Sequence, residues 1–123
     1  MGGSSQDKKF YALNLFDVAD VDKYLAYFSR LPEVAPQYGG RFVAFGRFNE
    51  TVAGELAPRQ VMIVVEWASE SEFKRFQDNP ELADLHPLRD DGTASYIWQT
   101  FHGVDMTDPA TVAIDDILAV LKP

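Results

Sequence analysis

Four short apolar segments, separated by amphipathic ones, constrain the fold of this chain more than any other feature. Residues 10–16, 41–48, 60–67 and 96–102 are rich in β-branched and aromatic side chains, and each is predicted to be a strand. Between the first two strands, and again between the last two, apolar residues recur three and four positions apart, which indicates amphipathic helices. The order β-α-β-β-α-β predicts an α+β, ferredoxin-like βαββαβ fold: a four-stranded antiparallel sheet with two helices on one face.

Local sequence signals place the ends of these helices. Gly39 and Gly40 are expected to stop the first helical region, because glycine readily adopts the left-handed conformation that follows a helix. Ser69 and Glu72 match the capping box that begins the second helical region. Pro87 is expected to end that region, which leaves the preceding histidine in a loop.

The chain is long enough for one domain with a short flanking segment at each end. Its 123 residues match the usual size of a single domain. Residues 10–104 are predicted to form the ferredoxin-like domain, and residues 1–9 (MGGSSQDKK), which are mostly small and polar, a disordered tail. Residues 105–123 contain a further amphipathic helix, which is expected to pack on its own subunit or on a partner subunit.

The charge balance and the absence of cysteine exclude several function classes. Lysine and arginine number 11 against 19 aspartates and glutamates, so the net charge is −8, which argues against nucleic acids and anionic membranes as partners. Without cysteine there are no disulfides or thiolate metal sites, and the two histidines have no ligand-spaced neighbour, so neither a metal nor a cofactor is predicted. No segment resembles a secretory signal or a bilayer-spanning helix, so the expected location is the cytoplasm.

Apolar residues occupy both faces of the predicted strands. In the third strand Met62 and Val64 share one face while Ile63 and Val65 share the other, because successive strand residues point to opposite sides. Two helices cover only one face of such a sheet, and monomers rarely expose an apolar patch as large as the other face. The pattern predicts a homodimer whose two sheets pack face to face. The C-terminal helix leaves an alternative open, since it either folds over the open face or clasps the partner.

Polar residues inside apolar strands are the first candidates for a binding site. Asn14 interrupts the first strand and Glu66 the third, and burying either side chain without a partner would cost a few kcal/mol. Arg41 and Arg47 are predicted to share one face of the second strand. There, an arginine either pairs with Glu66 across the hairpin or binds a ligand.

Aromatic and basic residues complete the candidate set. Tyr24 and Trp98 either line a cavity between sheet and helices or belong to the core. Arg89 either binds an anionic group through its planar fork or pairs with the acidic residues that follow it. His102, at the end of the fourth strand, and Glu66 are the candidate catalytic residues, because either side chain can move a proton. The predicted ligand-binding residues are Asn14, Tyr24, Arg47, Arg89 and Trp98.

Several motifs, in sequence order, resemble the domain-of-unknown-function 1330 family. Residues 38–44 (YGGRFVA) are similar to its glycine pair, arginine and aromatic residue at the start of a strand. Residues 66–69 (EWAS) stand where the family has Glu-Phe-Pro-Ser, and residues 85–89 (LHPLR) resemble its Pro-Leu-Arg segment. The resemblance covers residues 10–102. Phe45 stands where the family tends to have arginine, so the chain resembles a divergent member.

This resemblance implies the dimeric α/β barrel superfamily, and with it the same homodimer that the strand pattern predicts. The predicted function is that of a small homodimeric protein with a small-molecule pocket between sheet and helices. The alternative that the superfamily implies is a cofactor-independent enzyme, similar to a monooxygenase or an isomerase, acting on a small organic or aromatic substrate. In that case His102 or Glu66 would move a proton.

Overall fold

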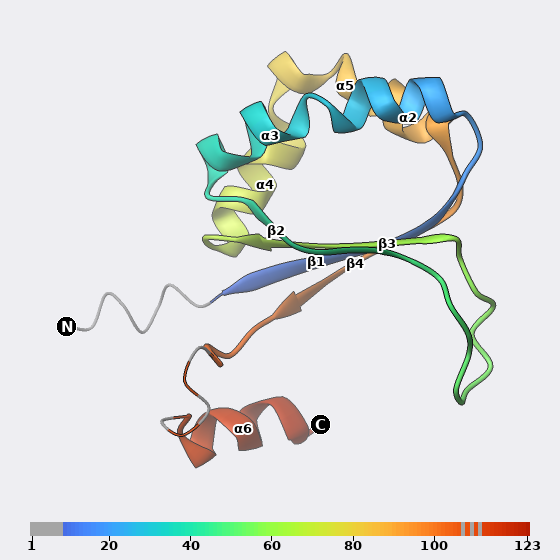
Figure 1. Ribbon diagram of the computed structural model, residues 1–123. Helices are drawn as coiled ribbons and strands as arrows, with labels where there is room; N and C mark the ends of the chain where they lie inside the picture. Colours follow the sequence, from blue (N-terminus) through green and yellow to red (C-terminus); the bar gives the residue numbers. More distant parts are fainter. Residues whose placement is uncertain (1–8, 107, 109, 111) are drawn as a thin grey trace.

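The computed structural model of the protein describes residues 9–106, 108, 110 and 112–123, so the predicted tail falls almost wholly outside it. Four antiparallel strands form one sheet in the order β2-β3-β1-β4 (Figure 1). Each pair of strands joined through a helix is separated by a third strand, which is the split βαβ arrangement of the ferredoxin-like fold. The predicted fold is therefore confirmed. The strands are β1 (Phe10–Val18), β2 (Arg41–Arg47), β3 (Val61–Trp67) and β4 (Thr93–His102).

Helical segments cover one face of this sheet, and a last helix lies on the other side (Figure 1). The helical segments between β1 and β2 and those between β3 and β4 lie side by side in one layer, where they contact each other mainly through α2 and α5 (Figure 1). The covering segments are α2 (Val21–Phe28), α3 (Leu31–Val34), the 3-10 turn η1 (Ala35–Tyr38), α4 (Glu70–Asp78), the 3-10 turn η2 (Pro80–Leu82) and α5 (Leu85–Gly92). The last helix is α6 (Ile114–Leu121).

The helix ends follow the local signals in two places and depart from them in a third. Gly39 ends η1 with a φ of 70°, and the Ser69 hydroxyl accepts a hydrogen bond from the Glu72 amide at 3.2 Å, as predicted. The prediction that Pro87 ends a helix is wrong, because α5 runs from Leu85 to Gly92. Pro87 lies in the first turn of α5, where a backbone N–H has no partner within the helix and its absence costs little.

The core lies between the sheet and the covering helices. Along β1, the residues at even positions from Phe10 to Phe16 are buried and face the helices, while the odd positions face the opposite side. Phe16 is fully buried, and its ring centroid lies 4.8 Å from that of Tyr24 and 5.3 Å from that of Tyr96. Aromatic side chains therefore join β1, β4 and α2 in the centre of the molecule.

An irregularity in β2 corrects one prediction. The pairing of β2 with β3 shifts between Phe42 and Ala44, so that Arg41 pairs with Glu66 while Arg47 pairs with Val61. Since positions 61 and 66 face opposite sides of β3, the two arginines also lie on opposite faces, and the prediction that they share a face is wrong. The cause is one extra residue in β2, which reverses the alternation after it.

The second face of the sheet is apolar and only partly covered. Leu13, Leu15, Met62, Val64 and Ile97 alternate with the buried residues and are half-buried. All eight residues of α6 are exposed, so this helix does not shield the face in the single chain.

Candidate functional site

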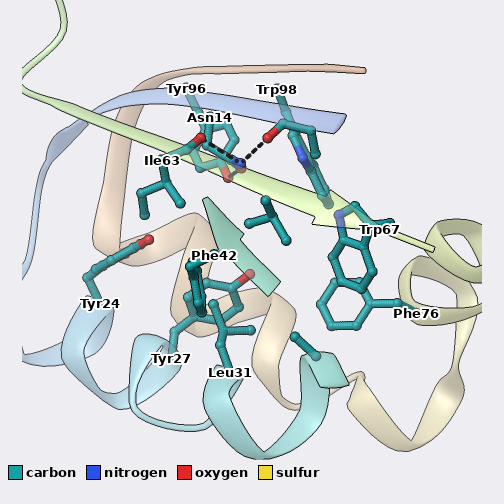
Figure 2. A pocket seen from close by; sticks show the side chains of 13 residues that line it. Asn14, Tyr24, Tyr27, Leu31, Phe42, Ile63, Trp67, Phe76, Tyr96 and Trp98 are labelled. Atoms are coloured by element: carbon teal, nitrogen blue, oxygen red, sulfur yellow. Dashed lines mark hydrogen bonds between the residues drawn. The ribbon is translucent and has the colours of Figure 1, made fainter. Parts of the chain in front are cut away.

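A small cavity lies between the sheet and the helix layer (Figure 2). Its volume is about 30 Å³, and a buried water needs roughly 10–15 Å³ on the same scale. The cavity thus holds one or two water molecules as it stands, and a larger molecule would have to displace lining side chains. The lining is mostly apolar and aromatic, and the lining residues that carry polar side-chain atoms are Asn14, Tyr24, Tyr27, Trp67, Tyr96 and Trp98.

Asn14 brings a buried amide to the cavity from the middle of β1. It is only 8% exposed, and its carbonyl oxygen accepts a hydrogen bond from the Tyr96 hydroxyl. Its amide nitrogen makes only long contacts, 3.3 Å to the Ile63 carbonyl oxygen and 3.4 Å to that of Ala12. The oxygen of Asn14 is therefore firmly paired, whereas its N–H donors are weakly used.

Trp67 contributes a donor that has no partner. It is the last residue of β3, is 4% exposed, and packs its indole ring against Phe73 and Phe76 with centroids 5.5 and 4.7 Å away. Within the described residues, its Nε1 atom is the one buried side-chain nitrogen or oxygen without a hydrogen bond. Leaving such a group unpaired costs about 1–3 kcal/mol. Since Trp67 lines the cavity, an acceptor atom placed there would recover that cost.

Three phenols and one guanidinium set the electrostatics around the cavity. Burial raises the pKa of Tyr24, Tyr27 and Tyr96, and the positive charge of Arg89 acts in the opposite direction on each of them. The phenols are therefore neutral at physiological pH. The Arg89 guanidinium stacks on Trp98, with Cζ 4.8 Å from the ring centroid, and its Nε lies 3.3 Å from the neighbouring Asp90 carboxylate. Arg89 thus makes the predicted pair with the acidic residues while also lying beside the cavity.

Glu66 lies on the opposite face of the sheet from the cavity. Its carboxylate is held by Arg41, whose Nε is 3.0 Å away, and by Lys9 at 3.4 Å. Partial burial alone would raise the pKa of Glu66, but hydrogen bonds from Arg41, Tyr11 and Lys9 outweigh it and lower the pKa below its usual value. The arginine pair across the hairpin is therefore present, and it is made by Arg41.

His102 and Arg47 also lie away from the cavity. His102 ends β4 with 69% of its side chain exposed, 5.3 Å from the Phe10 ring and with Nε2 3.8 Å from the Glu70 carboxylate. Arg47 ends β2, is exposed, and borders a second hollow. The structure therefore brings together Asn14, Tyr24 and Trp98, with Arg89 beside them, and leaves the other three candidates outside.

Sequence reasoning did not single out Tyr27, Trp67 or Tyr96 as cavity residues. Tyr27 follows Tyr24 by three positions, and Tyr96 and Trp67 occupy inward positions of their strands. For Tyr96 the signal is its position relative to Asn14. Trp98 pairs with Asn14 across β1 and β4, and Tyr96 lies two residues before Trp98, so all three side chains face the same side of the sheet. Among the described residues, no group of three or more histidines and carboxylates is placed to hold a metal ion, and no helix is long and apolar enough to cross a bilayer.

Solved structures of other proteins share this fold at low sequence identity. A protein of unknown function from Rhodopseudomonas palustris superposes with a TM-score of 0.71 at 16% identity, covering 80% of this chain and 85% of that one. SnoaB, a cofactor-independent oxygenase from Streptomyces nogalater, gives 0.56 at 14% identity, covering 80% and 95%. A dimeric ferredoxin-like protein of unknown function from Thermobifida fusca gives 0.56 at 19% identity, covering 80% and 93%.

Comparison of the sequence itself points to one family. No curated protein gives a significant match to the chain. Residues 9–99, which include β1 to β3, the helices between the strands and most of β4, match the family model described as a domain of unknown function, DUF1330. The chain therefore belongs to the domain-of-unknown-function 1330 family.

Proposed function

We propose that the protein binds a small, largely apolar molecule in the cavity between the sheet and the helices. The observation that carries this proposal is the buried Nε1 of Trp67, a cavity-lining residue: this atom has no hydrogen-bond partner among the described residues. Buried donors are almost always paired in proteins, so an unpaired one at a cavity wall is best explained by an acceptor that arrives with a ligand.

The lining defines the chemistry of that ligand. Aromatic walls favour a flat, apolar body, and the N–H donors of Trp67 and Asn14 favour an oxygen acceptor such as a carbonyl. The neutral phenols add hydrogen-bonding groups without charge. Because the cavity is only about 30 Å³, a ring-sized ligand must move some of the lining side chains when it binds.

The experiment uses two ligands of one shape, acetophenone and α-methylstyrene, which differ by a carbonyl in place of a methylene. The chain has only two tryptophans, so its NMR spectrum contains two indole N–H signals, which Trp67→Phe and Trp98→Phe assign. Acetophenone is expected to shift the Trp67 signal and to bind about fivefold more tightly than α-methylstyrene, which corresponds to one net hydrogen bond.

Trp67→Phe should abolish this preference, whereas Trp98→Phe should keep it, because the Trp98 ring lines the same cavity without being the unpaired donor. Shifts confined to surface residues, or equal affinity of the wild type for both ligands, would contradict the proposal.

The protein is also proposed to act as a homodimer through the open face of its sheet. The apolar side chains on that face support this, as does the Thermobifida fusca neighbour, which is described as dimeric. Light scattering at micromolar concentration should give twice the mass of the 13.8 kDa chain, and a monomer there would refute the dimer.

A second candidate function is cofactor-independent catalysis on a small organic or aromatic substrate, by a monooxygenase-like or isomerase-like reaction. The supporting observation is the pair of N–H donors at the cavity, since such donors stabilise an oxygen atom that gains negative charge during a reaction. SnoaB, which shares the fold, is a cofactor-independent oxygenase. Glu66 and His102 lie outside the cavity, so Glu66→Gln and His102→Ala would test them: turnover equal to that of the wild type would remove both from the mechanism.

A further inference from the structure

A second hollow lies on the side of the sheet away from the cavity. It has a volume of about 450 Å³ and is formed by the connection between β2 and β3 together with the adjoining open face of the sheet. Its apolar lining includes Leu15, Phe48, Val52, Leu56 and Met62, and of these Val52 is 90% and Leu56 64% exposed. We call it the hairpin hollow. Exposed aliphatic side chains around a concave surface indicate that something apolar fills it.

The helix α6 presents an apolar face that stays exposed among the described residues. Ile114, Ile117, Leu118 and Leu121 recur at the spacing of one helical face and are 68%, 36%, 39% and 71% exposed. An eight-residue helix in water is marginal without tertiary packing, so this face needs a surface to cover it. The helix lies outside the family match, which ends at residue 99.

The arrangement of the two surfaces favours a second copy of the chain as the occupant. Both α6 and the β2–β3 connection lie on the side of the sheet opposite α2 to α5, but toward opposite ends of it (Figure 1). In a symmetric dimer every contact occurs twice, so each chain must carry both halves of the contact, as this chain does. A two-fold axis between the two ends brings α6 of one subunit to the hairpin hollow of the other.

Charge supports the same pairing. Arg59 borders the hairpin hollow, and Asp115 stands in the first turn of α6, beside its apolar face. Among the described residues, neither Arg59 nor Asp115 takes part in an ion pair. A partner's α6 in the hollow would place the Asp115 carboxylate near the Arg59 guanidinium, which favours that orientation over a non-specific apolar contact.

We infer that α6 of each subunit seats its apolar face in the hairpin hollow of the partner subunit and so clasps the homodimer. The inference rests on the proposed dimer through the sheet faces. It assigns residues 105–123 to the partner instead of to their own sheet.

Cysteine cross-linking tests the inference directly, because the chain contains no cysteine of its own. One preparation carries Leu118→Cys and the other Val52→Cys with a different affinity tag, and the two are mixed, allowed to exchange subunits and oxidised. A disulfide-linked heterodimer is expected in the mixture and not in either preparation alone. The matched control is Asp116→Cys, which lies on the other side of α6 and should cross-link at least about fivefold less.

The possible outcomes separate the inference from the dimer on which it rests. Deleting residues 105–123 should weaken dimerisation by about tenfold or more, because four apolar side chains lose their contacts. A chain with both cysteines that cross-links within itself, at monomer mass, would show that α6 covers its own sheet and would overturn the inference. If the deletion leaves the dimer affinity unchanged and the cross-linking mixture gives no heterodimer band, the inference is also overturned, but the sheet-face dimer still holds. A monomer at all concentrations would refute both.

Discussion

At the scale of single residues, the cavity is organised around the hydrogen bond between Asn14 and Tyr96. It joins β1 to β4 through side chains and satisfies two polar groups that are otherwise surrounded by aromatic rings. The Tyr96 ring also stacks on Phe16, so the hydroxyl is fixed in position by packing as well as by its partner.

Removing both partners of this bond should cost less than the two single losses added together. Asn14→Ala leaves the Tyr96 hydroxyl unpaired, and Tyr96→Phe leaves the Asn14 oxygen unpaired, so each should lower the free energy of unfolding by about 1–3 kcal/mol. The double variant should be less destabilised than the sum of the two, with a coupling energy of about 1 kcal/mol, measured by urea denaturation. Strict additivity would show that the bond contributes nothing to stability.

Glu66 should make stability depend on pH in a defined direction. Its pKa in the folded protein lies below the ordinary value of 4.5, so the unfolded chain holds its proton more tightly and stability falls as the pH is lowered. The stabilisation is fully present above 4.5 and is lost as the pH falls through the folded-state pKa. Glu66→Gln should therefore be less stable than the wild type at pH 7, and the difference should vanish in acid.

The control for this measurement is Glu50→Gln in the exposed β2–β3 connection. Because Glu50 takes part in no ion pair among the described residues, its replacement should lower the free energy of unfolding at pH 7 by less than Glu66→Gln does, when both variants are compared at one protein concentration. An equal effect of the two substitutions would show that the ion pairs of Glu66 have no specific role.

The candidate site was predictable in part, and the missing part has a physical reason. Asn14 stands out as a polar residue in an apolar strand. The residues two positions before and after it, Ala12 and Phe16, are apolar and buried, which places Asn14 on the helix side of the sheet. Trp67 gives no such signal, because a tryptophan at an inward strand position is ordinary core. That its N–H lacks a partner depends on how atoms from other elements, such as the phenylalanine rings of α4, pack around the indole ring, which no local pattern encodes.

At the scale of elements, the turn between η1 and β2 depends on glycine for two reasons. Gly39 has a φ of 70°, and a Cβ added there would lie 2.5 Å from the Cβ of Ala68. Gly54, in the β2–β3 connection, has a φ of 103° but no atom within 4 Å of such a Cβ. Gly39→Ala should therefore lower the free energy of unfolding more than Gly54→Ala, which carries only the backbone cost of about 1–2 kcal/mol. Equal losses in urea denaturation would contradict the close packing at Ala68.

The order and type of the elements followed from the sequence, while two of their details did not. Periodicity placed all four strands and the helices that cover them. Pro87 misled the prediction because proline breaks a helix interior but is tolerated in a first turn, and the register of that turn depends on packing of Leu85. The shift in β2 was hidden because aromatic residues on both sides of Val43 allow either alternation, and contact of Phe42 and Phe45 with Phe28 decides between them.

At the scale of the whole molecule, the proposed dimer makes stability a function of concentration. Unfolding of a dimer releases two chains, so each tenfold increase in protein concentration should stabilise it by about 1.4 kcal/mol. The midpoint of urea denaturation should therefore rise when the protein concentration is raised from about 1 to about 100 μM. A midpoint independent of concentration would show that the folded unit is the single chain.

The sheet is one residue thick, and this has a consequence for communication through the molecule. In β1, Asn14 faces the cavity while its neighbours Leu13 and Leu15 face the proposed partner, so one backbone serves as the wall of both sites. A ligand that displaces this backbone and a partner that holds it in place act on the same equilibrium. By thermodynamic reciprocity, whatever factor dimerisation imposes on ligand affinity, the ligand imposes on dimer affinity.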